Sequence, residues 1–138
     1  MNTVIIDGLS FALPLFIMAI GGIYSEKSGI TNLAIEGLQG FGAFTGALVA
    51  VLVADKFAGN SAVPFYIAVL FAVIGGMLFS LIHALLCIRC KANMVISGVV
   101  INILAMALTS FLTKQINATV FGAASDKFVL GVSSRLTV

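Results

Sequence analysis

Four long apolar runs, separated by short polar links, dominate the chain. They cover about residues 4–23, 33–54, 63–88 and 95–112. As helices these runs would be about 27 to 39 Å long, enough to cross a hydrocarbon core of about 30 Å. An open sheet cannot satisfy its backbone in lipid, and the runs lack the alternation of a barrel strand. The pattern therefore predicts an all-α, polytopic membrane protein with about four transmembrane helices.

The last part of the chain has a different pattern, in which Lys114, Asp126 and Arg135 are mixed with short apolar pairs. This segment is too polar to span a membrane and too short to form a domain. We therefore divide the chain into a transmembrane domain, residues 1–113, and a polar extramembrane loop or truncated tail, residues 114–138.

The composition narrows the class of protein further. Of the 138 residues, 61% are hydrophobic and 9% are charged, against about 25% charged in a typical soluble domain. So few charges could not cover a soluble core with a wettable surface. The net charge of +2 and the absence of a basic stripe argue against a nucleic-acid partner.

The positive charges do not decide the orientation by number alone. With the N-terminus outside, three cations lie in inner loops and three in outer ones. The link at residues 89–94 holds two cations and no acid in a short stretch. We therefore expect this link in the cytoplasm and the N-terminus outside.

Two polar residues within the second run, Glu36 and Gln39, lie at helical spacing with neighbours that together define one face. The residues of this face are Asn32, Glu36, Gln39, Ala43 and Gly46. Beside it, Gly42 and Gly46 form a small-residue seam for helix packing. A carboxylate at the centre of a membrane helix costs about 2.5 to 3.5 kcal/mol, and the cost is smaller for Glu36, which lies nearer the end of its run. Since charges within membrane helices are functional by default, Glu36 indicates a pathway-lining or interhelical site. The alternative is a carboxylate at a helix start, stabilised by the dipole and by headgroup water.

The fourth run carries a second polar stripe, with Gly98 one turn before it. The residues of this stripe are Asn102, Ala105, Thr109 and Thr113. Asn102 lies near the middle of its run, where an unpaired amide is costly. It either donates to a neighbouring helix as a structural brace or lines an aqueous path for a polar solute, and the sequence leaves both interpretations open.

The sequence offers few candidate residues for catalysis or metal binding. His83, Cys87 and Cys90 are spaced to share one helix face, but zinc needs a fourth ligand or a water, and the chain has no further Cys or His. We predict packing roles for these residues and no metal site. A P-loop is excluded because Glu26 replaces the glycine required before the lysine. We therefore predict that the chain is not an enzyme.

Two stretches carry a family resemblance. Residues 21–37 read GGIYSEKSGITNLAIEG, with Gly-Ala-Phe at 42–44. Residues 91–98 read KANMVISG, with Asn102 after them. In this order they resemble signature segments of bacterial ABC importer permeases of the branched-chain amino acid and simple-sugar superfamily. The similarity is greatest to nucleoside or simple-sugar permeases, and it covers about residues 9–112.

The resemblance implies a set of partners. These are a cytoplasmic ABC ATPase, a second permease subunit, an extracytoplasmic substrate-binding lipoprotein and the lipid bilayer of the bacterial inner membrane. ATP would be used by the partner subunit, and this chain would bind no cofactor. The resemblance also places Asn32, Glu36, Ser97 and Asn102 near the central helices of a permease.

One departure from the family bears on function. Family members are considerably longer, and their segment that couples to the ATPase has no counterpart here. We therefore expect a truncated, N-terminal piece of a permease that forms part of a translocation pathway for nucleosides or simple sugars. The alternatives are a small self-assembling channel or secondary carrier, or a non-transporting membrane scaffold subunit.

Overall fold

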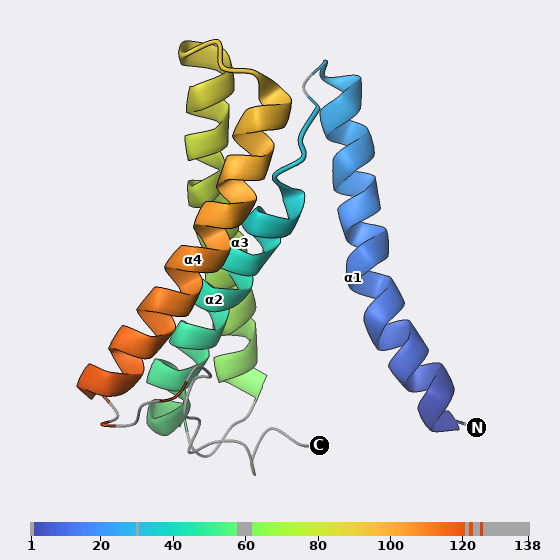
Figure 1. The fold of residues 1–138 in the computed structure, drawn as a ribbon. Helices are drawn as coiled ribbons and strands as arrows, with labels where there is room; N and C mark the ends of the chain where they lie inside the picture. Colours follow the sequence, from blue (N-terminus) through green and yellow to red (C-terminus); the bar gives the residue numbers. More distant parts are fainter. Residues whose placement is uncertain (1, 30, 58–61, 121, 123–124, 126–138) are drawn as a thin grey trace.

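The computed structural model describes residues 2–29, 31–57, 62–120, 122 and 125. Within this part of the chain every long element is a helix (Figure 1). The elements in chain order are α1 (Asn2–Lys27), α2 (Ile35–Ala54), a 3₁₀ turn (Asp55–Phe57), α3 (Ala62–Ala84), a π turn (Leu85–Arg89) and α4 (Met94–Val120). Four of these helices, the third including the π turn, are long and apolar enough to cross a membrane. The all-α, multi-pass prediction is confirmed.

The fourth helix is longer than its apolar run. Since α4 ends at Val120, the loop expected from Lys114 onward is wrong for residues 114–120. Lysine and glutamine are good helix formers. The hydroxyls of Thr113 and Thr119 each donate to the carbonyl one turn earlier, both at 2.8 Å. Polarity therefore ends the apolar run without ending the helix. Most of the remaining predicted tail lies outside the described residues.

The junction between α3 and α4 is tightly built. The N–H of Cys90 donates to the Leu85 carbonyl at 3.2 Å, a bond five residues back that widens the last turn. Lys91 then takes a left-handed conformation (φ 51°), as residues that terminate helices often do. Asn93 caps the N-terminus of α4, because its Oδ1 accepts from the N–H of Val95 at 2.9 Å.

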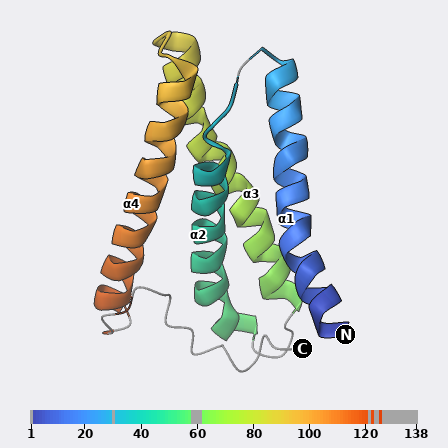
Figure 2. The ribbon, with the colours of Figure 1, turned by 45° about the vertical axis from the view of Figure 1, so that its right-hand side comes forward.

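Three of the helices form a bundle and the first stands beside it. Figures 1 and 2 show α2, α3 and α4 together, with α1 as a separate column. α2 packs most extensively on α3 and next on α4, whereas α1 makes few contacts with α2. The interior of the molecule therefore lies around α2.

A small apolar core holds this bundle together. Ala34, Phe79, Ile101 and Ala105 are buried and in contact. The ring of Phe41 on α2 stacks on Phe79 of α3, with centroids 4.3 Å apart. The core therefore joins α3 and α4 to α2 and to Ala34, the residue just before α2.

The start of α2 is set back from the ends of its neighbours. In both views, α2 begins part-way along the bundle, after the chain has descended from the end of α1 (Figures 1 and 2). Residues 31–34 are not helical. Non-helical backbone at membrane depth is tolerated where protein buries it or where it lines a polar cavity. This position makes the start of α2 a candidate site.

Candidate functional site

Two asparagines satisfy the backbone at the start of α2. Asn32 Oδ1 accepts from the N–H of Ala34 at 2.9 Å. From α4, Asn102 Oδ1 accepts from the N–H of Gly37 at 2.8 Å, and its Nδ2 donates to the Leu33 carbonyl at 2.9 Å. The first N–H groups of a helix lack intrahelical partners. Asn102 therefore supplies from another helix what the local chain cannot.

Glycines allow this close approach of α4 to the chain. A Cβ on Gly37 would lie 2.8 Å from the Cα of Asn102. A Cβ on Gly98, one turn earlier on α4, would lie 2.8 Å from the Cβ of Leu33. Such distances are too short for real Cβ contacts, so both positions require glycine. The structure thus uses Gly98 to bring Asn102 within bonding distance.

A hollow of about 100 Å³ lies beside this junction, between α2 and α4. Its lining includes Glu36, Gly37, Gly40, Asn102, Ala105 and Thr109. The side chain of Glu36 is exposed, and Thr109 is half-buried. The Thr109 hydroxyl donates to the Ala105 carbonyl of its own helix at 2.8 Å, so its oxygen can still accept. The structure therefore brings Glu36, Asn102 and Thr109 together.

The other predicted residues of the α2 face divide between two environments. Gln39 is exposed and does not line this hollow. Gly42 and Gly46 instead pack against α3. A Cβ on Gly42 would lie 2.8 Å from the Ala72 carbonyl oxygen, and one on Gly46 would lie 2.9 Å from the Ala72 Cβ. The small-residue seam thus borders α3, while the carboxylate and amide face away from it.

Ser97 takes part in a separate interhelical contact. Its Oγ lies 3.0 Å from Nδ1 of His83, and both residues are buried. The Sγ of Cys87 lies 3.7 Å from Nε2 of the same ring. The contact joins α3 to α4 and fixes the imidazole in place.

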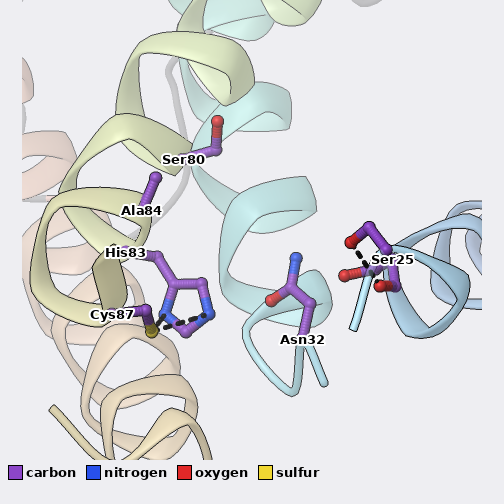
Figure 3. Close-up of a pocket in the computed structure, with 7 residues that line it drawn as sticks. Ser25, Asn32, Ser80, His83, Ala84 and Cys87 are labelled. Atoms are coloured by element: carbon purple, nitrogen blue, oxygen red, sulfur yellow. Dashed lines mark hydrogen bonds between the residues drawn. The ribbon is translucent and has the colours of Figure 1, made fainter. Parts of the chain in front are cut away.

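A second, more polar pocket of about 190 Å³ opens beside His83. Its lining includes Ser25, Ser28, Asn32, Ser80, His83 and Cys87. These residues come from the end of α1, the link before α2 and the end of α3. In Figure 3 the His83 ring lies beside Cys87, and Asn32 lies across from the ring. The pocket therefore borders the same link that the asparagines hold.

Cys90 does not share this environment, although its spacing predicted a common face. Cys87 is buried and Cys90 is exposed. The π turn at Leu85–Arg89 holds more residues than an α turn, so it rotates Cys90 away from His83. Among the described residues, no group of three or more His, Cys, Asp or Glu could hold a metal ion.

The sequence reasoning missed the serines of the polar pocket. Ser80 precedes His83 by three residues and Cys87 by seven, so its spacing alone could have placed it on their face. Ser25 and Ser28 gave no such signal, because they lie at and just after the end of α1 and reach the pocket only through the tertiary placement of that segment. The contact of His83 with Ser97 likewise depends on helix pairing.

The chain also matches a known family. The profile of the family described as branched-chain amino acid transport system / permease component matches residues 4–138. The chain therefore belongs to this family of ABC transporter permeases.

Particular relatives carry more specific names. The chain is 42% identical over 108 residues to the guanosine ABC transporter permease protein NupQ of Bacillus subtilis, covering 78% of this chain and 33% of that protein. It is 34% identical over 112 residues to the nucleoside ABC transporter permease protein NupC of Lactococcus lactis, covering 81% and 34%. It is 35% identical over 100 residues to the putative glucose ABC transporter permease protein TsgC13 of Haloferax volcanii, covering 72% and 28%.

The matched region is thus about a third of the length of these curated relatives. No solved structure matches the chain.

Proposed function

We propose that the chain forms part of the translocation pathway of an ATP-binding-cassette importer for nucleosides or simple sugars. The observation that carries this proposal is the polar, non-helical start of α2 inside the bundle, in a chain of the permease family. In membrane transporters, interrupted helices place polar backbone and side chains where solutes bind. The names of the relatives supply the solute classes.

Two sets of residues have different roles in this proposal. Asn32, Ser97 and Asn102 brace the helices, because their bonds join the link or α4 to neighbouring elements. Glu36 and Thr109 face the open hollow and are assigned to the pathway. Gln39 is exposed on α2 and is assigned to the same pathway on its spacing alone.

The proposal includes partners that supply the energy and the solute. A cytoplasmic ABC ATPase would hydrolyse ATP, so this chain would act as a transport subunit without an ATPase of its own. A second permease subunit would complete the pathway, and an extracytoplasmic lipoprotein would deliver the solute. The complex would reside in the bacterial inner membrane.

Uptake by the reconstituted complex tests this function. The chain, assembled with the ATPase, second permease and lipoprotein, is placed in vesicles, and ATP-dependent uptake of labelled guanosine and glucose is measured. We expect ATP-dependent uptake of one of them, strongly reduced by Thr109→Val or Glu36→Gln. Gly8→Ala, at a position with open space around it, is the matched control.

Two other outcomes would contradict the proposal. Flux driven by an ion gradient without the ATPase would identify a channel or secondary carrier. Stable assembly with partners but no flux of any solute would identify a scaffold subunit.

A further inference from the structure

The polar pocket beside His83 has a lining suited to one kind of ligand. Its polar side chains come from three serines, one asparagine and one histidine, and no carboxylate, lysine or arginine lines it. A charged ligand would find no compensating charge there, and burying an uncompensated charge is costly. The lining therefore favours an uncharged polar solute.

The hydrogen bonds already made in the pocket define what the solute must offer. The Ser80 hydroxyl donates to the Met77 carbonyl at 2.7 Å, and the Ser28 hydroxyl donates to the Ser25 carbonyl at 2.6 Å. Both oxygens therefore have lone pairs left to accept a hydrogen bond. Asn32 uses its Oδ1 on the backbone, which leaves its NH₂ group to donate. A ligand hydroxyl can both donate to a serine and accept from an amide.

The imidazole of His83 is held rigidly at the wall of this pocket. It is 5% exposed, and its contact with Ser97 at 3.0 Å fixes the ring plane. Figure 3 shows the ring on the side of the pocket that Asn32 faces. Nδ1 is paired with Ser97, whereas the neighbour of Nε2 is the Cys87 Sγ at 3.7 Å, a weak hydrogen-bonding group. Nε2 is therefore the ring nitrogen with capacity left for water or a solute in the cavity.

We infer that this pocket binds an uncharged, polyhydroxylated solute, such as a sugar or the ribose of a nucleoside, as one station on the transport pathway. The inference rests on the proposed function and deepens it. The pocket is lined by the end of α1, the link before α2 and the end of α3. α1 and α3 end at the same end of the molecule, where the link 89–94 also lies (Figure 1). With the cation-rich link 89–94 in the cytoplasm, this station is on the exit side.

The two cysteines provide a matched pair of reporters. Cys87 lines the pocket, whereas Cys90, three residues later, is exposed and outside its lining. A small methanethiosulfonate reagent should modify Cys87 only when it enters the pocket. A solute bound there should therefore protect Cys87 and leave Cys90 unaffected.

The experiment uses the chain assembled with its transport partners in inside-out vesicles. Labelling rates are measured for Cys87 in a Cys90→Ser background and for Cys90 in a Cys87→Ser background, with and without saturating guanosine or glucose. We expect the transported solute to slow labelling of Cys87 at least about fivefold and to leave Cys90 unchanged. Labelling of Cys87 that is equally fast with solute, or absent in both conditions, overturns the inference.

Substitution of a pocket serine adds a second readout. Ser80→Ala removes an acceptor, so it should raise the KM for uptake about tenfold, and raise the solute concentration that half-protects Cys87 by a similar factor, with little change in kcat. Ser10→Ala is the control, because Ser10 makes the same kind of bond to its own helix, 2.8 Å to the Ile6 carbonyl, far along α1. Equal KM values for the two variants would contradict the inference. Absence of ATP-dependent uptake in the unsubstituted complex would instead contradict the proposed function.

Discussion

Of the first two helices, the more apolar one, α1, is exposed, and the less apolar one, α2, is the more buried. α2 has the lowest mean hydropathy of the four candidate spans and the largest buried share, whereas no part of the α1 window is buried. In water the more apolar helix would be the more buried. In lipid the surroundings are as apolar as leucine, so small and polar residues select the interface. α2 carries those residues on the faces that meet α3 and α4.

We expect the largest loss of stability from a substitution in the small-residue seam between α2 and α3. Gly42→Leu places a Cβ against the Ala72 carbonyl, where a Cβ would lie at 2.8 Å, so the two helices must separate. Overpacking of this kind costs about 3 kcal/mol, and we expect a large drop in the unfolding temperature of the purified protein in detergent. Gly8→Leu on α1, where nothing lies within 4 Å, is the control. Equal loss in both variants would show that α1 is packed too.

Two phenylalanines, one in the bundle and one on α1, compare the two regions with a single residue type. Phe79 is 4% exposed and stacked on Phe41, whereas Phe11 on α1 is 76% exposed. Phe79→Ala leaves a cavity of roughly 100 Å³, and the cavity term alone, at about 24 cal/mol per Å³, lowers the free energy of unfolding by about 2 kcal/mol. Phe11→Ala should change it by less than about 0.5 kcal/mol. Denaturant titration in micelles measures both, and similar values would refute the contrast.

We expect a smaller loss of stability from replacing Asn102, the amide side chain of α4 that bonds to the backbone at the start of α2. Asn102→Ala removes two hydrogen bonds and leaves the Leu33 carbonyl and the Gly37 N–H without their partner from α4. We expect a loss of about 1 to 2 kcal/mol. Thr109→Val on the same stripe loses only a bond within its own helix, so its stability should hardly change. Hydrogen exchange at Gly37 should speed up in the alanine variant alone, and unchanged exchange would contradict the bracing role.

The smallest effect concerns the contact between Ser97 and His83. Ser97→Ala removes one interhelical hydrogen bond, which in membrane proteins averages about 0.6 kcal/mol. Thermal unfolding of this variant should therefore begin slightly earlier than that of Ser110→Ala, an exposed serine on the same helix. A double variant with His83→Ala should cost no more than His83→Ala alone, and full additivity would argue against the pairing.

The sequence predicted the helices better than their contacts. The apolar runs located all four spans, because length and composition decide what can cross a bilayer. The end of α4 was placed too early, since polarity does not by itself stop a helix. The pairing of Asn102 with Gly37 joins residues 65 positions apart, and nothing local encodes it. The π turn that separates Cys90 from Cys87 was likewise invisible to a spacing rule that assumes α geometry.

The bond between Asn102 and the start of α2 also sets an order of events during synthesis. Gly37 must wait for a partner that lies 65 residues later in the chain. At about 5 to 20 residues per second, the ribosome needs roughly 3 to 13 seconds to make that stretch. Until α4 is inserted, the first turn of α2 has no amide from α4 to complete it. The second helix of this chain is therefore finished only after the fourth has entered the membrane.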